Sequence, residues 1–348
     1  MDFYSPFSNF CKSRYPIFAE VFPSQETLQV FVSPLVVRLP KSFYDEAEAC
    51  LSAIYRARKN EAPQLFDPGN ESAFISFDFY ATDDGMRLIE INTNAVGSLL
   101  TALLSEYHGL GSAQSHFLDM RHMFQTELKL SGQKTPPKNV AIVDDAPETQ
   151  KTAFDFYLHK ALFESWGWPT RIVDPAALTP DISLIYNRST DFFLTSPQWQ
   201  ATRNAYLSKQ VCITPNPHEY ALLADKSRLI YFSSLNSPCL PQVLAVDSVP
   251  SDELWERRRK LFFKPKHSYG GKAAYKGDGI SRKVFEHVLQ GNYVAQPYFT
   301  AKTIEDFKYD VRFFVYRGNI QLVAARLFKG QLTNFKTPGG GFAPVSFS

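Results

Sequence analysis

The fold of this chain is decided by the stretch FKPKHSYGGK at residues 263–272, taken together with EINTN at residues 90–94. The first stretch predicts a strand that ends in a lysine and continues into a glycine loop, where small residues let backbone N–H groups approach phosphate oxygens. The second places Glu90, Asn92 and Asn94 on one face of a strand, because strand side chains alternate between two faces. Oxygen ligands of this kind suit Mg²⁺, which commonly bridges to nucleotide phosphates. The two stretches together indicate an enzyme that uses ATP.

Length and composition limit the classes of protein to consider. The 348 residues allow about two domains of ordinary size. The net charge of +2 argues against a protein that binds nucleic acid or a membrane surface, because both usually carry a basic excess. The four cysteines form no CxxC pair, the N-terminus lacks a signal-peptide pattern, and no apolar run approaches the ~18 residues of a membrane span. We therefore expect a cytoplasmic protein with free thiols.

Periodicity and turn signals predict the order of elements. Amphipathic spacing predicts a helix at 41–58, and two strands follow at 74–80 and 86–92. After a polar, proline-rich linker at 133–138, strands alternate with helices from 139 to 215, which predicts an α/β fold with a small parallel sheet. Further helical segments are predicted at 96–107, 116–130, 148–166 and 217–235, and further strands at 262–265, 293–296, 310–316 and 320–328.

The predicted parallel sheet has polar residues where its strands end. Asp144 and Asp145 follow the first strand, and Asn187 and Arg188 follow a later one. Ligands of open α/β sheets bind in the crevice outside the carboxyl ends of the strands. We therefore expect a crevice lined by these four residues.

The early hairpin carries the candidate metal ligands Asp78, Glu90 and Asn92. If residues 83–85 form the whole loop, with Gly85 at the left-handed position, Asp78 lies opposite Glu90. Like charges paired across a sheet are unfavourable unless something compensates them, and a divalent cation would do so. A two-residue loop would shift the pairing by one and separate the carboxylates. A solvated acidic face on an exposed hairpin explains the same residues without a metal.

The candidate phosphate loop contributes Ser268, Gly270, Gly271 and Lys272, and Lys264 precedes it on the strand. The stretch is neither a Walker A motif nor GxGxxG. A bare pair of glycines is usually a turn, so the loop alone is a weak signal.

Two further segments are candidates for contacts to a nucleotide. Lys226 adds one more lysine, and the segment with Gln296, Tyr298 and Phe299 offers a hinge with backbone groups for an adenine. A strand end broken by Pro297 explains the second segment equally well.

The last predicted hairpin places Asp310 and Arg312 on one strand face, with Arg326 on the partner strand. A three-residue turn would pair Arg326 with Asp310, and a two-residue turn would pair it with residue 311. The bland alternative is a salt bridge on a solvated face. The loop at 333–341 is too rich in glycine for a core element, and it is either a lid over a site or a frayed terminal segment.

In combination, these pieces resemble the ATP-grasp superfamily, and within it the glutathione-synthetase-like ligases. Its members carry a "KP" strand, a glycine-rich phosphate loop, a hinge, a "DxR" strand, an arginine followed by a glycine-rich lid, and an "ExN" strand that holds magnesium. The matching stretches here are 264–265, 269–272, 296–299, 310–312, Arg326 with 333–341, and 90–92. The resemblance covers most of residues 35–345.

The order of these pieces departs from the usual family pattern. The ExN strand normally comes last, whereas here it comes near the start of the chain. This order resembles a circular permutation, as in the glutathionylspermidine-synthetase-like branch, and such relocation is physically reasonable where the termini lie close together at the surface. Pro297 stands where many relatives carry an acid, so the residue that grips the ribose stays open.

The resemblance implies three parts and their roles. Residues 1–132 would be the permuted C-terminal part of the ATP-grasp domain, 133–216 a small pre-ATP-grasp domain, and 217–348 the remaining ATP-grasp subdomains. ATP would be held by Lys226, Lys264, Ser268, Gly270, Gly271, Lys272, Gln296, Tyr298, Phe299 and Asp310. Mg²⁺ would be held by Asp78, Glu90 and Asn92.

The implied reaction joins a carboxylate to an amine through an acyl phosphate. Arg312 and Arg326 would be catalytic, the latter by stabilising the acyl phosphate and the oxyanion that follows it. Arg188 would clamp a substrate carboxylate through its planar fork, although an ordinary surface arginine is nearly as good an explanation. Asn94, Asn334 and Gly340 would line the acceptor pocket.

Two other functions stay open at this point. An ATP-grasp kinase would phosphorylate a small molecule and form no amide, and a regulatory protein would bind ATP without turning it over. The expected partners are small-molecule carboxylates and amines, with neither nucleic acid nor membrane. Relatives often form dimers, so the resemblance also allows a homodimer.

Overall fold

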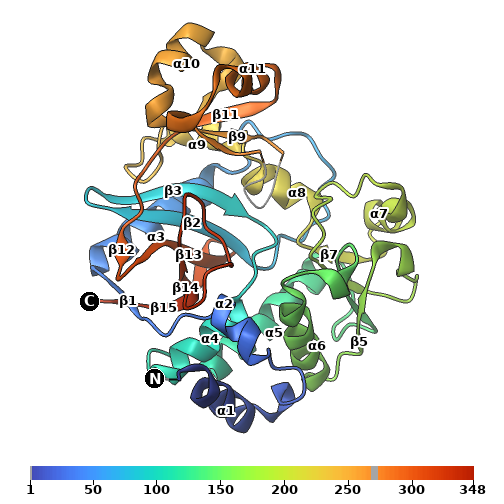
Figure 1. The fold of residues 1–348 in the computed structure, drawn as a ribbon. Helices are drawn as coiled ribbons and strands as arrows, with labels where there is room; N and C mark the ends of the chain where they lie inside the picture. The colour runs from blue at the N-terminus through green and yellow to red at the C-terminus, as the bar shows by residue number, and fades with distance from the viewer. Residues whose placement is uncertain (1, 268–272) are drawn as a thin grey trace.

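The computed structural model describes residues 2–267 and 273–348, which build three β-sheets (Figure 1). The largest sheet has the strand order β1-β15-β14-β13-β2-β3, with β12 paired to β13. Its strands are β1 (Val37–Leu39), β2 (Ile75–Thr82), β3 (Gly85–Asn92), β12 (Thr303–Ile304), β13 (Phe307–Tyr316), β14 (Asn319–Phe328) and β15 (Gly341–Phe347). Strands from the first 92 residues of the chain therefore share one sheet with strands from its last part.

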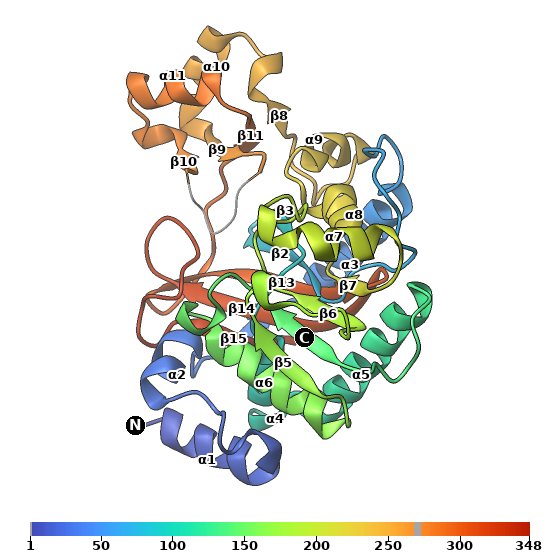
Figure 2. The same cartoon turned by 90° about the vertical axis from the view of Figure 1, so that its right-hand side faces the viewer.

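Helices cover both faces of this large sheet (Figures 1 and 2). The helices are α1 (Tyr4–Arg14), α2 (Gln25–Phe31), α3 (Lys41–Ala57), α4 (Ser98–Tyr107) and α5 (Ala113–Leu130). The apolar positions that predict α3 are all buried, and they pack with side chains of β2 and β13 in one core cluster. On the other face, α4 lies against β14 and β15, and α1 and α5 pack around it.

The β2–β3 hairpin differs from the predicted three-residue loop. Thr82 pairs with Gly85, so the loop has two residues, and Gly85 has a φ of 106°. A two-residue loop alone would separate the two carboxylates, but Ile89 is an extra residue on β3 that restores the pairing of Asp78 with Glu90. Such a β-bulge places two residues opposite one and leaves the ladder disrupted locally.

The β13–β14 hairpin, whose turn length the sequence leaves open, also combines a two-residue turn with one extra residue. Its turn has two residues, Arg317 and Gly318, both with positive φ as a type I′ turn requires. An extra residue on β14, Gln321, then shifts the register, so Asp310 pairs with Arg326. The two-residue turn together with the extra residue therefore gives the pairing of Asp310 with Arg326 that a three-residue turn alone would give.

The second sheet is parallel, as the alternation of strands and helices predicts. It contains β4 (Val140–Val143), β5 (Thr170–Val173), β6 (Leu184–Asn187) and β7 (Cys212–Thr214) in the order β5-β4-β6-β7, with helices α6 (Ala153–Ser165) and α7 (Gln200–Leu207). The chain passes from β4 to β5 at one edge of the sheet and then crosses back past β4 to β6. The strand order therefore reverses between β4 and β6. Helix α6 begins five residues later than the predicted start at 148.

The third sheet forms a separate lobe, at the top of Figure 1. It contains β8 (Leu244–Ala245), β9 (Leu261–Pro265), β10 (Tyr275–Lys276) and β11 (Tyr293–Pro297), with α10 (Ser251–Arg257) and α11 (Arg282–Gln290) packed on it. The single helical segment expected from 217 to 235 is wrong, because it divides into α8 (Pro217–Glu219), a π-helical turn at 220–224 and α9 (Arg228–Phe232). Asp225 interrupts it by taking extended ψ and accepting hydrogen bonds from Ser227.

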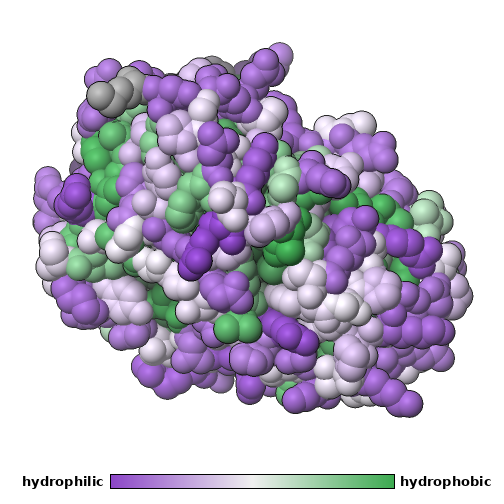
Figure 3. Space-filling view, turned by 90° about the horizontal axis from the view of Figure 1, so that it is seen from below, coloured by the Kyte–Doolittle hydropathy of each residue, from purple (hydrophilic) through white to green (hydrophobic). Residues whose placement is uncertain are grey.

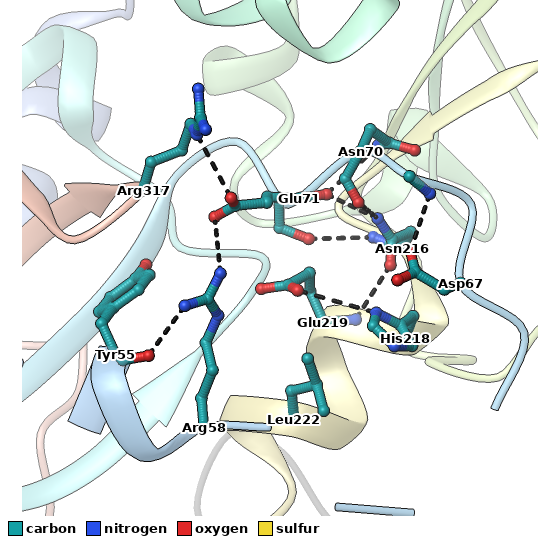
Figure 4. Close-up of polar contacts among 12 residues, drawn as sticks. Tyr55, Arg58, Asp67, Asn70, Glu71, Asn216, His218, Glu219, Leu222 and Arg317 are labelled. Carbon is teal, nitrogen blue, oxygen red and sulfur yellow. Dashed lines mark hydrogen bonds and ion pairs between the residues drawn. The ribbon is translucent and has the colours of Figure 1, made fainter. Parts of the chain in front are cut away.

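A polar cluster ties the parallel sheet to the large one (Figure 4). The Glu71 carboxylate lies 3.4 Å from Arg58, just after α3, and 3.3 Å from Arg317 in the β13–β14 turn. Asn216, which follows β7, donates to the backbone carbonyls of Asn70 and Glu71 at 3.2 and 2.6 Å. These contacts fix the parallel sheet at one end of the large sheet.

The cysteines, the helices and the surface can each be compared with what the composition predicts. All four cysteines are free and buried. Among the described residues, no helix combines the length and the apolar character needed to cross a membrane. The face seen from below shows scattered apolar groups among many polar ones (Figure 3).

Candidate functional site

A cavity of about 1020 Å³ is lined by residues of the large sheet and of the third sheet, and by residues that follow strands β4 and β6 of the parallel sheet. This volume is at the upper end of the ~300–1,000 Å³ common for small-molecule sites. The cavity gathers most of the predicted site residues that the structure describes: Glu90, Asn92, Asn94, Arg188, Lys226, Lys264, Gln296, Tyr298, Phe299, Arg312, Arg326 and Asn334.

Some predicted site residues lie elsewhere. Asp78 and Asp310 are fully buried behind the cavity wall. Gly340 is buried against the Leu327 carbonyl oxygen, which would lie 2.7 Å from an added Cβ, and it is absent from the cavity lining. The phosphate-loop candidates Ser268, Gly270, Gly271 and Lys272 lie outside the described residues.

Strand register builds a charged ladder beneath the cavity. Arg312 pairs across the sheet with Asp78, and its Nε and Nη2 donate to the two Asp78 oxygens at 2.8 and 2.7 Å. Arg326 pairs with Asp310, donates to both of its oxygens at 2.8 Å, and reaches Asp78 Oδ2 at 2.8 Å. The two arginines and the two aspartates form one buried network.

This network changes the explanation for the paired acids. We expected a cation to compensate Asp78 and Glu90, but the guanidinium groups of Arg312 and Arg326 already do so for Asp78. Burial disfavours the ionised carboxylate, yet the two arginines outweigh burial and hold the pKa of Asp78 below its usual value. Asp78 therefore stays charged and is fully engaged behind Glu90.

Glu90 and Asn92 face the cavity itself. The Asn92 amide nitrogen donates to Asp78 at 3.0 Å and to Glu90 at 3.2 Å, so the amide oxygen remains for another ligand. Among the described residues, no group of three or more His, Cys, Asp and Glu side chains gathers as a metal site. A carboxylate with one amide oxygen nevertheless suits Mg²⁺, which takes one or two protein ligands and fills its remaining positions with phosphates and water.

Lys264 sits at the bulge of β3. Its Nζ donates to the carbonyl of Ile89, the extra residue, at 2.7 Å and to Gln296 Oε1 at 2.9 Å. Gln296 in turn donates to the Leu88 carbonyl at 2.9 Å. Burial, helped by Lys226 nearby, lowers the pKa of Lys264 to about 8, against the opposing effect of Glu90.

Lys226 lines the same cavity as Lys264 and is 9% exposed. It follows Asp225, where the helical segment breaks, so the break presents this lysine to the cavity. Burial also lowers the pKa of Lys226, while Glu90 and Asp225 oppose that shift. The two lysines and Glu90 thus share one electrostatic environment.

The expected hinge is the end of β11. The Tyr298 N–H donates to the Lys260 carbonyl at 2.8 Å, and Lys276 Nζ lies 4.4 Å from the centre of the Tyr298 ring. Pro297 ends the strand opposite Leu261. The side chains of Tyr298 and Phe299 line the cavity directly after it.

The loop after β14 covers the cavity and is not a frayed end. Residues 329–337 line the cavity, and the chain then continues into β15 of the large sheet. Phe335 stacks on Phe31 of α2 with ring centres 4.9 Å apart, and the Gly339 N–H donates to the Gln29 carbonyl at 2.8 Å. Thr333 donates to Asp310, so the lid also touches the charged ladder.

Sequence reasoning missed several lining residues. The helix predicted at 148–166 includes residues 150–152, but these residues precede α6 and line the cavity. Phe31 and Phe156 also line it, and an isolated phenylalanine carries no signal that separates a cavity wall from a core. The polar residues after β4 and β6 were the only hint to this part of the site.

Comparisons with known proteins place this arrangement among solved folds. No protein-family model matches the chain, and no curated protein matches its sequence. A protein provisionally named gamma-glutamylcysteine synthetase, from Methylobacillus flagellatus KT, matches with a TM-score of 0.53 and 12% identity over 88% of this chain and 87% of that chain. The two proteins share a fold. D-cycloserine synthetase DcsG matches with a TM-score of 0.31 and 19% identity over 50% of this chain and 67% of that chain.

Proposed function

We propose that this chain is an ATP-dependent ligase that joins a carboxylate to an amine through an acyl phosphate and releases ADP and phosphate. One observation carries the proposal. A single cavity collects Lys226, Lys264, Glu90, Asn92 and Arg326, although they come from separate segments of the chain. Unrelated surface charges would have no reason to converge there. The match in fold to a protein named as a synthetase agrees with this choice.

The lysines and the hinge would hold the nucleotide. Phosphoryl transfer depends mainly on positioning and on neutralising charge. Lys264 is fixed by Ile89 and Gln296 next to the hinge, and Lys226 faces the same space. The adenine would lie by Tyr298 and the phosphates towards Glu90.

Glu90 and Asn92 would hold Mg²⁺, and Asp78 behind them would keep Asn92 oriented. When bound, the ion would bridge phosphate oxygens and neutralise the charge that develops on them. Asn92 donates its nitrogen to both acids, so its oxygen would face the ion.

Arg326 would stabilise the acyl phosphate and the oxyanion that the amine then produces. Burial disfavours its charged form, but Asp310 and Asp78 outweigh burial and raise the pKa of Arg326 above its usual value. Its hydrogen bonds to Asp310 and Asp78 use Nε and Nη2, and Nη1 makes none with the described residues. Arg312 would act as a support, because it holds Asp78 and touches the Val96 carbonyl.

The proposal includes a permuted ATP-grasp domain. In its support, β2 pairs with β13 and β3 follows β2 in the same sheet, although more than 200 residues separate β2 and β3 from β13 in sequence. The N–H of Lys41 also donates to the Ser348 carbonyl at 2.9 Å, so the last residue lies next to the start of α3. Such proximity is what a permuted order requires.

Product analysis tests the proposal. Purified protein would be incubated with Mg-ATP and a pool of amino acids, small peptides and polyamines, followed by mass spectrometry. We expect ADP, phosphate and a new mass equal to two pool members minus water. ADP together with a phosphorylated pool member would show that the protein is a kinase and not a ligase. Binding of Mg-ATP without turnover across the pool would favour a regulatory protein.

Variants at two residues test the assigned site. Glu90→Gln removes the negative charge that would hold Mg²⁺, and Arg326→Lys removes the planar guanidinium that would contact the acyl phosphate. Each variant should abolish ATP turnover. Matched controls on the same hairpins are Asp83→Asn, whose carboxylate is 98% exposed, and Arg317→Lys in the β13–β14 turn. Unchanged turnover in both site variants, with circular dichroism confirming folding, would contradict the assignment.

A further inference from the structure

The parallel sheet brings two opposite charges to the point where its strand order reverses. Asp144 follows β4 and Arg188 follows β6, and these strands are neighbours with Val143 paired to Asn187. After β4 the chain continues to β5 on one side, and after β6 it continues to β7 on the opposite side, which makes this a topological switch point. Ligands of open α/β sheets bind in the crevice at such points. Both side chains line the large cavity.

Arg188 is built into this crevice rather than lying on the surface. It is 5% exposed, and its Nη1 donates to the Ala95 carbonyl and the Tyr186 hydroxyl, both at 2.9 Å. Its Nη2 lies 3.8 Å from Asp155. Its Nε is buried and makes no hydrogen bond within the described part of the chain. A buried guanidinium with a donor left over is costly unless a ligand completes it.

Asp144 is the matching acid. It is 8% exposed, and one oxygen accepts from the Asp145 N–H at 2.8 Å. Within the described residues it has no ion pair, and Arg188 is paired with Asp155 instead. Burial raises the pKa of Asp144 to about 6, although the hydrogen bond from the Asp145 N–H and the charge of Arg188 oppose this shift. At neutral pH the crevice therefore holds a carboxylate and a guanidinium that do not neutralise each other directly.

We propose that this crevice binds the ammonium and carboxylate of an α-amino acid, with the ammonium on Asp144 and the carboxylate on Arg188. A ligand with only a carboxylate would bring its charge next to Asp144, and a ligand with only an amine would meet Arg188. Neighbouring strands lie about 4.8 Å apart, which suits two opposite charges on one carbon atom. The inference rests on the proposed function, because it makes this amino acid one of the two substrates of the ligase.

An aromatic ring and a loop line the crevice beside Asp144 and Arg188. The Phe156 ring centre lies 5.9 Å from the Arg188 guanidinium carbon, and Phe156 lines the cavity. Exclusion of water by such a wall strengthens charge pairing. The loop at 150–152, which enters α6, completes the wall on the Asp144 side.

Binding of small ligands, measured without turnover, tests the inference. Calorimetry of the full chain with Mg-ADP would compare each standard α-amino acid with its decarboxylated amine and its N-acetyl derivative. We expect saturable binding of at least one amino acid, and at least ~10-fold weaker binding of both derivatives, since each loses one charged hydrogen bond. Equal binding of either derivative, or no saturable binding of any amino acid, would overturn the inference.

Two variants make the test reciprocal. Asp144→Asn should weaken the intact amino acid by at least ~10-fold but leave the N-acetyl derivative unchanged. Arg188→Lys should weaken the intact amino acid and leave the decarboxylated amine unchanged. Asp145→Asn is the matched control, because Asp145 bonds to Ser189 and Gln198 and is not part of the cavity lining. Equal effects of Asp144→Asn and Asp145→Asn would overturn the assignment of the ammonium.

The two proposals fail separately. If an amino acid binds as described but no ATP is consumed with any partner, the ligase proposal fails and the crevice assignment stands. If an amide forms between substrates that are not α-amino acids, the ligase stands and the crevice assignment fails.

Discussion

At the scale of single residues, the site is governed by charges that are buried before any ligand arrives. Asp78 and Asp310 are fully buried, and Arg312 and Arg326 are less than 10% exposed. Removing one member of such a set strands its partner in a medium of low polarity, which is strongly destabilising. The ladder is therefore a fixed platform, and the groups free to respond to substrates are those that face the cavity.

Lys264 is the cavity residue with the clearest response to pH. Its pKa is about 8 because burial disfavours the ammonium, and Lys226, Glu90 and Asp78 act on it as well. Phosphate groups favour the protonated form, so ATP bound as proposed would raise this pKa. The affinity for Mg-ATP should therefore be highest below pH 8 and should fall as the pH rises, by up to about tenfold per unit above 8. Equilibrium dialysis between about pH 7 and pH 9.5 would measure it.

A substitution distinguishes the contribution of Lys264 to this pH dependence from that of Lys226. Lys264→Arg keeps a positive charge throughout this pH range, because an arginine does not lose its proton in proteins. We expect the pH dependence of ATP affinity to flatten in this variant, whatever happens to the affinity itself. The same pH dependence in wild type and variant would assign it to Lys226 or to the nucleotide and contradict the prediction.

At the scale of elements, two bulges set the register on which the site depends. Both hairpins have a two-residue turn and one extra residue, Ile89 on β3 and Gln321 on β14. The side-chain period of a strand is two, so each bulge changes which residues face each other across the ladder. The bulge at Ile89 has a second effect, since it leaves a carbonyl for Lys264.

The bulges also show where the sequence stops being informative. The strands and the long helix α3 are predictable because their apolar periodicity is long and regular. The pairing of Asp78 with Glu90 was predicted for the wrong reason, from a three-residue loop that the structure replaces by a shorter loop and a bulge. No turn rule locates an extra residue inside a strand, because its position is fixed by partners distant in sequence, such as Lys264.

Deleting Ile89 tests the second effect of the bulge. The deletion leaves the loop intact and brings Glu90 directly after Leu88, so Asp78 still faces Glu90. It removes the carbonyl that Lys264 binds at 2.7 Å. We expect Mg-ATP affinity to fall by roughly 10-fold, the typical worth of one hydrogen bond to a charged group, while the thermal midpoint changes little. Isothermal titration calorimetry and thermal unfolding would measure the two quantities.

The other bulge supplies the control for this deletion. Gln321 is the extra residue of β14, and it does not line the cavity. Its deletion makes the same change in strand length while keeping Asp310 opposite Arg326. Equal losses of ATP affinity in the two deletions would show that general damage to the sheet, rather than the contact with Lys264, is responsible.

At the scale of the whole molecule, segments from the two ends of the chain close the same cavity. The first 34 residues lie outside the stretch that resembles a known family, and no motif marks them. Yet α2 lies against the lid, where Phe31 stacks on Phe335 and Gln29 accepts the Gly339 N–H. Because the lid touches the charged ladder as well, the N-terminal segment is part of the enclosure of the cavity. A periodicity analysis has no access to such a contact, since seven residues of α2 carry too few turns for a pattern.

The lid contact yields a prediction for the whole molecule. Phe31→Ala should free the loop at 329–340, because an aromatic pair contributes about 0.5–1.5 kcal/mol beyond burial. Hydrogen exchange at the Gly339 amide, which donates to Gln29, should become roughly 2–10-fold faster, and the double variant Phe31→Ala/Phe335→Ala should add little to either single change. Phe10→Ala in α1, whose ring packs on Tyr107 and not on the lid, should leave this exchange unchanged. Equal exchange in Phe31→Ala and in Phe10→Ala would mean that β15 and the ladder, rather than α2, hold the lid closed.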